Sequence, residues 1–473
     1  MKNNNTKSSN ITAISNPLKN INPNVAGVDI GAGSIYICAP ISSEKLEVRE
    51  FLTVTADLKA AAKWLKTCKV TSVAMESTGS YWIPTFEIFE EAGLEVVLAN
   101  AYHLKAVPGR KTDVKDCQWI QHLHSLGLLR GSFRPKKDAV EFRAYVRQRS
   151  KLIELLSMQA QLMNKALIQM NIRLDRVLSD ITGVSGFAII RAIVAGERDP
   201  KKLALHRNYR CSKTTEEVIL ALEGNFRSEH IFALKQALES HDFLKNQISE
   251  CEQEIKKHLD IWNAEQEKQN AVKSPADTDN KVNIVQAEQT QKTKKLSKNA
   301  YDFNADELIT NACGVDLTKV PGIDTSTAIK IISEIGRDVS AWGTAKQFAS
   351  WMGLCPGNKI SGGRILSGRI VPTKNRVKQA FLMAASTLHH STSALGAFYR
   401  RMRSRLGAPK AVTATAHKLA TIVYNMLKNG SEFYEIGQEA YEKRYEKRTI
   451  ANLKANAAKF GYVVVKAEQK SVA

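Results

Sequence analysis

Between residues 25 and 98, short apolar runs alternate with stretches whose apolar positions recur every three or four residues. The short runs are bounded by glycine or polar residues, as is typical of buried strands, and the periodic stretches are typical of helices that bury one face. The pattern predicts an α/β domain. The predicted strands are 25–28, 34–39, 46–54, 70–75 and 94–98, and the predicted helices are 56–68 and 84–92.

Four carboxylates stand at ordered places in this pattern, which is the ribonuclease-H-like order of elements. Asp29 follows the first strand, Glu76 ends the fourth, and Asp113 and Asp116 open a helix after the loop 105–112. A spacing of three puts the last two on one helix face. Four converging acids repel one another unless one or two Mg²⁺ ions neutralise them, so we expect all four to be catalytic metal ligands. The alternative is that Asp113 is an N-cap and Asp116 a first-turn acid favoured by the helix dipole.

Two heptad seams predict two long helices, one over 138–178 and one over 234–262. Arg149 interrupts the first seam, and we interpret His241 and His258 in the second as tolerated positions rather than ligands. The two helices form either an antiparallel coiled-coil arm, a dimerisation element or an ordinary core pair. The pattern does not decide whether the partner helix lies in the same chain.

From Val339 to Ser431 the chain contains no Asp and no Glu, and fourteen cations there supply fourteen of the formal net charge of +21. Such a one-sided field favours an anionic partner, first the backbone of nucleic acid and only second a membrane surface. The turn Ser361-Gly362-Gly363, followed by Arg364, lies among these cations. Without carboxylates, this stretch needs acids from elsewhere for any chemistry that uses a divalent metal.

The last folded part begins near Asn304 and is predicted to be mostly helical. Val320-Pro321-Gly322-Ile323 resembles the turn of a helix-hairpin-helix element, which offers backbone N–H groups to a phosphate, although a plain turn before a helix is the alternative. The predicted helices are 326–335, 345–352, 376–390 and 412–427.

Several classes of protein do not fit the chain. Its seven cysteines are scattered singly without a C-x-x-C pair, which is typical of reduced cytosolic thiols rather than of disulfides or zinc sites. The N-terminus lacks the apolar segment of a signal peptide, and no apolar run reaches the roughly 18 residues of a membrane span. We therefore expect a cytoplasmic protein without a membrane partner.

The ordered acids and four short phrases resemble the DEDD transposases of the insertion sequence 110 family, in particular its insertion sequence 1111 branch. The resemblance covers residues 25–180 and 305–435, and the combination of phrases is what makes it specific. The phrases are Glu76–Trp82, Val107–Asp113, Val320–Ile323 and Phe348–Pro356.

The resemblance implies a DNA recombinase that cuts and rejoins donor and target DNA, guided by a structured bridge RNA that pairs with both. It also implies a homo-tetramer, a dimer of dimers, and a serine nucleophile that forms a covalent phosphoserine link to DNA. Ser361 falls at the matching place after Gly353-Leu354-Cys355-Pro356, and Ser367 is the competing candidate. The acids would supply Mg²⁺ to activate the serine, which the acid-free stretch cannot do alone.

The same resemblance sets the expected architecture, an α/β domain followed by all-α parts. Residues 179–227 inside the arm have no assigned role. The expected segments are a disordered N-terminus (1–24), a RuvC-like DEDD domain (25–135), a coiled-coil arm with an inserted segment (136–263), a disordered linker (264–303), a C-terminal transposase domain (304–435) and a basic tail (436–473).

Basic residues near these motifs are expected to contact nucleic acid, and Arg364 and Arg369 are candidates to stabilise the charge that develops on the phosphorus centre. The full set is Arg110, Lys111, Lys359, Arg364, Arg369, Lys374, Arg376, Arg400, Arg401, Arg403 and Arg405.

Three other functions are compatible with parts of the pattern. A metal-dependent, RuvC-like structure-specific endonuclease needs the four acids but no serine. A sugar-kinase or actin-like ATPase would use Asp29–Ser34 as a phosphate loop, but its second phosphate loop and adenosine motif are missing from the sequence. A non-enzymatic nucleic-acid scaffold would need only the basic stretch.

Overall fold

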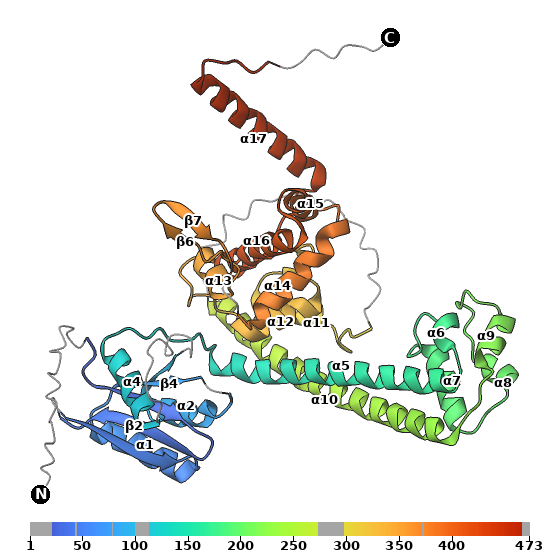
Figure 1. Ribbon diagram of the computed structural model, residues 1–473, viewed down its shortest axis with the longest axis horizontal. Helices are drawn as coiled ribbons and strands as arrows, with labels where there is room; N and C mark the ends of the chain where they lie inside the picture. Colours follow the sequence, from blue (N-terminus) through green and yellow to red (C-terminus); the bar gives the residue numbers. More distant parts are fainter. Residues whose placement is uncertain are drawn as a thin grey trace, which may run out of the picture. The chain divides into compact units, whose positions relative to one another are not determined.

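The computed structural model describes residues 21–42, 45–77, 79–99, 113–272, 298–370 and 373–465 (Figure 1). The chain divides into two compact units, Met1–Arg134 and Pro135–Ala473. The loop 105–112, and with it Arg110 and Lys111, lies outside the described residues. No helix in the described ranges is both long and apolar enough to cross a membrane.

The first unit is built on a mixed five-stranded sheet with the strand order β3-β2-β1-β4-β5 (Figure 1, blue). Strand β1 is antiparallel to β2 and parallel to β4, and β4 is parallel to β5. This is the ribonuclease-H-like arrangement predicted from the sequence. The elements are β1 (Val25–Ile30), β2 (Ser34–Pro40), β3 (Leu46–Leu52), α1 (Thr55–Thr67), β4 (Ser72–Glu76), α2 (Trp82–Glu91), β5 (Glu95–Ala99) and α4 (Asp113–Ser125).

Helices cover both faces of this sheet. Val28 of β1 and Met75 of β4 join a core with Leu58 of α1 on one face. On the other face, Ala74 of β4 clusters with Ile120 of α4. The central strands are therefore buried on both sides, which explains why they read as continuous apolar runs in the sequence.

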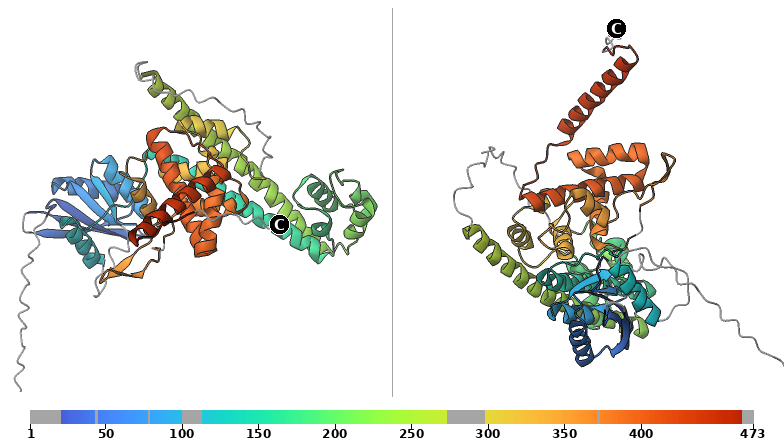
Figure 2. Two further views of the ribbon diagram at one scale, coloured as in Figure 1. Left: turned by 90° about the horizontal axis from the view of Figure 1, so that it is seen from above. Right: turned by 90° about the vertical axis from the view of Figure 1, so that its left-hand side faces the viewer.

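The second unit begins with a two-helix arm, α5 (Lys137–Gln169) and α10 (Ser228–Val272), whose helices lie side by side and antiparallel (Figures 1 and 2). The rings of Phe142 and Trp262 have centroids 4.7 Å apart, and Leu152 packs in one cluster with Leu244. The two heptad seams thus meet within one chain.

Short helices close the end of the arm. Helix α5 ends at Gln169, earlier than predicted, because Asn171 adopts a left-handed φ of 59°. Residues 179–227 are not featureless, since Ile189 and Leu222 bury their side chains in one core with Leu234 of α10. The short helices are α6 (Leu174–Val177), α7 (Val184–Val194), α8 (Pro200–Ala204) and α9 (Thr215–Leu222).

A buried ion pair lies where polar residues interrupt the arm. Arg149 Nε donates to Glu252 Oε1 at 2.6 Å, and each side chain is only 4% exposed. A second nitrogen of Arg149 donates to the backbone oxygen of Asn299 at 2.9 Å. These bonds pair donors and acceptors that would otherwise be buried without a partner, so losing one side of the pair would leave a buried charge.

The expected linker 264–303 is ordered at both ends. Helix α10 continues to Val272. At the other end, Arg149 lies 3.8 Å from the ring centre of Tyr301, which is buried, and the N–H of Asp302 donates to Glu252 at 3.0 Å. The linker prediction differs here because a long-range polar contact, invisible in local composition, holds the end of the segment.

The remainder of the second unit is helical apart from one hairpin. The sequence predicted α12, α13, α14 and most of α16, but it did not predict α15 or the hairpin. The elements are α11 (Ala305–Cys313), η2 (Leu317–Lys319), α12 (Thr325–Ile335), α13 (Ala345–Trp351), β6 (Lys359–Ser361), β7 (Arg364–Ser367), α14 (Arg376–Thr387), η3 (Leu388–His390), α15 (Ala394–Leu406), α16 (Ala408–Asn429) and α17 (Gln438–Lys459).

The turn before α12 has a packing role. Gly322 has a φ of 90°, and a Cβ added to it would lie 2.7 Å from the backbone oxygen of Ala384 in α14. The Asp324 carboxylate caps α12 by accepting the N–H of Thr327 at 2.8 Å. The helix end before α12 is thus capped by a side chain of the same turn.

We predict that Arg149→Leu lowers the free energy of unfolding by about 3 to 5 kcal/mol, because it leaves the Glu252 carboxylate buried without its partner. The double variant Arg149→Leu/Glu252→Leu should be more stable than the single variant. Urea unfolding followed by circular dichroism measures both changes.

The control is Arg191→Ala, which breaks an exposed pair with Asp242 and should change stability by no more than about 1 kcal/mol. Equal losses in the Arg149 and Arg191 variants would contradict the assigned role of the buried pair.

Candidate active site

Asp29 and Glu76 lie next to each other at the carboxyl ends of two parallel strands. Val28 of β1 is in register with Met75 of β4, and each is followed directly by an acid, Asp29 or Glu76. Neighbouring strands are about 4.8 Å apart, which places the two carboxylates at adjacent positions of one sheet edge.

The direction of these two side chains follows from glycine at position 27. A Cβ on Gly27 would lie 2.4 Å from the Cys117 backbone oxygen of α4, so this face of β1 is in contact with α4. Side chains alternate along a strand, and Asp29 therefore points to the α4 side of the sheet. Ala74 faces the same helix, and Glu76 follows it by two residues.

Asp113 and Asp116 occupy the first turn of α4. The positive end of the helix dipole stabilises carboxylates in this turn. Asp113 is exposed and Asp116 is half-buried. All four acids thus belong to one side of the sheet and to the elements that cover it.

Two side chains near these acids, Cys117 and Tyr36, have raised pKa values to which the charges of the acids contribute. Burial raises the pKa of the Cys117 thiol to about 12, and the nearby charges of Cys38 and Asp29 add to that shift. The pKa of Tyr36, the cross-strand partner of Asp29, is raised mainly by its hydrogen bond to Glu50, with a smaller contribution from the charge of Asp113. Tyr36 therefore lies near Asp113 as well as opposite Asp29.

The chemistry of the four side chains fits a hard divalent cation, because carboxylate oxygens are its preferred ligands. Their spacing does not form a coordination shell. Within the described ranges, no three or more His, Cys, Asp or Glu side chains are close enough to hold a metal ion. The four acids therefore lie on one side of the sheet, but in the described residues they do not come together as a metal site.

Ser361 lies at the tip of a hairpin formed by β6 and β7. Gly362 and Gly363 connect the strands with φ values of 54° and 74°. Two successive positive φ angles are typical of the tight turn that matches the twist of a hairpin, and glycine adopts them without strain. Ser361 is exposed and pairs directly with Arg364. Ser367 lies at the other end of β7, half-buried, where its Oγ accepts the N–H of Arg369 at 3.3 Å.

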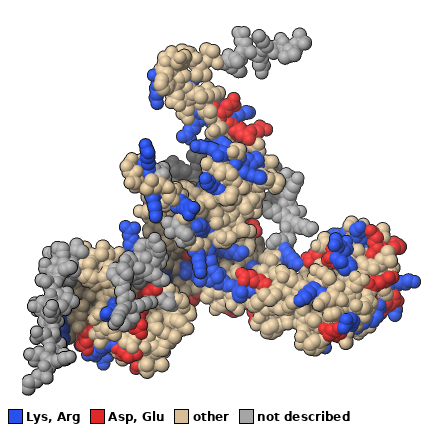
Figure 3. Space-filling model, in the orientation of Figure 1, with Lys and Arg blue, Asp and Glu red and all other residues tan. Residues whose placement is uncertain are grey.

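Around this hairpin the cations are exposed and lack carboxylate partners. Within the described part of the chain, none of the set forms an ion pair, and residues 339–431 contain no acid at all. The acidic side chains that Figure 3 shows toward the C-terminus belong to the chain beyond residue 431. Unpaired cations of this kind can bind a phosphate backbone without first breaking a contact. The set is Lys359, Arg364, Arg369, Lys374 and Arg376.

The arginines of α15 divide into two kinds. Arg400 donates to the backbone oxygen of Ser391 at 2.7 Å and to Gln438 Oε1 at 2.8 Å, and Arg401 lies 4.0 Å from the ring centre of Tyr445. These two side chains hold α15 against its neighbours. Arg403 and Arg405 are exposed, although Arg403 contacts His389. The structure thus gives half of the predicted cluster a role in packing.

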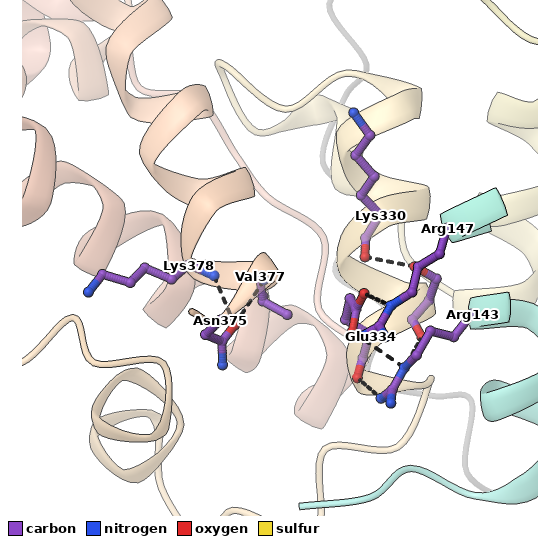
Figure 4. Close-up of polar contacts among 8 residues, drawn as sticks. Arg143, Arg147, Lys330, Glu334, Asn375, Val377 and Lys378 are labelled. Atoms are coloured by element: carbon purple, nitrogen blue, oxygen red, sulfur yellow. Dashed lines mark hydrogen bonds and ion pairs between the residues drawn. The ribbon is translucent and has the colours of Figure 1, made fainter. Parts of the chain in front are cut away.

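A cavity of about 700 Å³ that the sequence did not indicate lies between α5, α12 and α14. Figure 4 shows the polar contacts beside it. Arg147 makes two bonds of 2.7 Å to the Glu334 carboxylate, and Arg143 donates to the Glu334 backbone oxygen at 2.6 Å. Arg376 of the hairpin set also lines this cavity. The paired arginines fasten α12 to the arm, a long-range contact with no local sequence signal.

Two known families match segments of the chain. Residues 26–172 match the DEDD_Tnp_IS110 family, described as a transposase, and residues 316–400 match the family described as Transposase IS116/IS110/IS902. The first match contains all four acids, and the second contains Ser361. Among curated proteins there is no match to the chain.

We predict that Gly27→Ala disrupts the acidic side of the sheet. The added methyl group would overlap the backbone of α4, which must move or separate from β1. The free energy of unfolding should fall by about 1 to 3 kcal/mol or more, and amide hydrogen exchange should increase in α4. Hydrogen-exchange mass spectrometry measures the second effect directly.

Gly33→Ala is the matched control, because a Cβ at Gly33 meets no atom within 4 Å. If both variants leave exchange in α4 unchanged, the close contact at Gly27 does not position the helix.

Proposed function

Since the chain belongs to the IS110 family of transposases, enzymes that cut and join DNA, we propose that it does so through a covalent bond between DNA and Ser361. The observation that carries this proposal is the place of Ser361, exposed at the tip of a hairpin beside unpaired cations. The motif phrases further favour the insertion sequence 1111 branch of the family.

In the proposed reaction, Ser361 Oγ attacks a phosphorus atom of the DNA backbone. The bond from phosphorus to one deoxyribose oxygen breaks, that oxygen takes up a proton to become a hydroxyl, and the serine proton passes to a base or to water. A hydroxyl of a second DNA end then attacks the same phosphorus and releases Ser361. The phosphoserine link keeps the phosphodiester bond energy, so rejoining needs no external energy source.

Arg364 is suited to assist this attack. It is the direct cross-strand partner of Ser361, and side chains at paired positions have Cβ atoms about 5 Å apart. A guanidinium there stabilises the extra negative charge on the phosphate oxygens as the new bond forms. Arg369 and Lys359, at the base of the hairpin, bind the flanking backbone.

The DEDD transposase domain implies that a divalent metal ion is used. We propose Mg²⁺ as that ion, held by Asp29, Glu76, Asp113 and Asp116. A bound ion would polarise the phosphate and favour the deprotonated serine, which is otherwise a weak nucleophile. The residues of the chain contribute hard oxygen ligands on one side of the sheet and a nucleophile in a stretch without acids.

We also propose that a structured bridge RNA selects donor and target DNA and that the active assembly is a homo-tetramer. Support for the RNA is the motif resemblance together with the excess of positive charge, +21 for the whole chain. That excess is more than one hairpin needs to hold a single DNA backbone.

A second function is a metal-dependent nuclease that uses the acids alone. The adjacent positions of Asp29 and Glu76 on two parallel strands favour it, because paired strand-end carboxylates suffice for metal-assisted hydrolysis. In that case Ser361 has no chemical role.

Ser361→Ala should abolish the DNA adduct that survives denaturation in detergent, lowering its yield by about a thousandfold or more, as removal of a nucleophile does. Ser367→Ala is the matched control and should keep the adduct. Asp29→Asn should also lose the adduct while still binding DNA. Gel analysis of end-labelled DNA measures all three.

An adduct formed by the Ser361→Ala protein would exclude Ser361 as nucleophile. DNA cleavage that persists in Ser361→Ala but stops in Asp29→Asn would establish the nuclease function instead.

Full-length protein purified from its host should carry one structured RNA that sequencing finds strongly enriched over total RNA. The Ser361→Ala protein should carry the same RNA, because the serine acts on DNA. An RNA profile equal to that of total RNA would contradict guidance by RNA, while leaving the serine chemistry to be judged by its own adduct.

A further inference from the structure

Two large aliphatic side chains are exposed on the hairpin that carries Ser361. Ile360 is 62% exposed and Leu366 is 70% exposed. Single exposed aliphatic residues are common, but these two lie on a short ribbon whose other described side chains are polar or charged. Water contact at both positions is unfavourable in the free protein, so a partner that covers them would gain apolar contact.

A bulge sets the position of Leu366. Lys359 pairs with Ser367 and Ile360 pairs with Ile365, so Leu366 has no residue opposite it. Bulges are frequent next to active sites, where they redirect a side chain. The irregular register thus presents Leu366 outward instead of pairing it across the hairpin.

The charges beside these side chains identify what covers them. Lys359, Arg364 and Arg369 are exposed on the same ribbon, and no acid occurs between residues 339 and 431. A partner that combines negative charge with apolar surfaces fits this ribbon, and duplex DNA does so through its phosphates and stacked bases. The hairpin tip suits close approach to a backbone, because a Cβ at Gly362 or Gly363 would meet no atom within 4 Å.

We propose that Ile360 and Leu366 form an apolar wedge that unstacks a base step beside the phosphate attacked by Ser361. Apolar side chains of DNA-bending proteins act in this way, and the distortion opens the backbone on one side of the step. This inference rests on the proposed function in one respect only, namely which phosphate lies beside the unstacked step. It positions DNA and takes no part in the bond changes.

The wedge would also contribute to the choice of site. Pyrimidine–purine steps unstack most easily, so DNA with such a step at the cut should be preferred even where no base is contacted. A side chain that acts only through the fold of the hairpin would produce no such preference.

Potassium permanganate tests the wedge, because it oxidises thymines whose rings are unstacked. DNA fragments retained by the full-length protein are sequenced, resynthesised and treated while bound to the Ser361→Ala protein, which forms no covalent link in the proposed reaction. We expect hyperreactive thymines within one or two steps of the phosphate that the wild-type protein joins to serine. In Ile360→Ala/Leu366→Ala/Ser361→Ala this reactivity should fall by about fivefold or more, since a lost wedge returns the step to its stack.

Phe243→Ala in the same background is the matched control, because Phe243 is 60% exposed on α10, away from the hairpin, and its loss should leave reactivity unchanged. Leu366→Met keeps an apolar side chain and should keep the signal. Circular dichroism checks that each variant is folded.

Unchanged thymine reactivity in the alanine variants would overturn the wedge. So would a change of oligomeric state in those variants with reactivity retained, since it would assign the apolar pair to a protein contact.

The proposed function can fail separately from the wedge. Wild-type protein that forms no adduct would refute the serine chemistry, whereas thymine reactivity that depends on Ile360 and Leu366 would still show the wedge.

Discussion

Helix α4 crosses strand β1 so closely at Gly27 that a methyl group there would overlap the helix backbone. This approach determines how far the first turn of α4 lies from the strand ends. The strand ends present Asp29 and Glu76 on the α4 side, and the first turn presents Asp113 and Asp116. The acidic side of the sheet is therefore a consequence of backbone packing. Any residue larger than glycine at position 27 would change the spacing of the acids.

The distribution of charge divides the chemistry between two parts of the chain. Acids that bind a metal would repel phosphate if they stood among the cations of 339–431, and that stretch contains none. Conversely, Lys359, Arg364 and Arg369 would neutralise the metal ligands if they stood on the sheet. Because the acids and the cations belong to separate stretches of the chain, neither set neutralises the charge of the other before a polyanion and a divalent ion bind. In the proposed reaction, the two sets would come together only when DNA and the metal ion are bound.

Much of the first unit could be predicted because its signals are local. Its strands are short apolar runs bounded by glycine or polar residues, and the order of Asp29, Glu76, Asp113 and Asp116 follows directly from those boundaries. Other features depend on contacts between distant residues. The end of the linker is held by the Arg149–Glu252 pair, and α12 is held by Arg147 through Glu334. No composition or periodicity within a window of the sequence contains such information.

The hairpin shows a different limit of prediction. Strands of three and four residues are too short to show alternation, and Ser361-Gly362-Gly363 has the composition of a loose turn. The left-handed conformations of both glycines instead place the backbone of Ser361 opposite that of Arg364. A longer or less regular turn would let the two side chains move independently. Because the pairing is set by the backbone, one turn brings together the proposed nucleophile and the cation proposed to assist it.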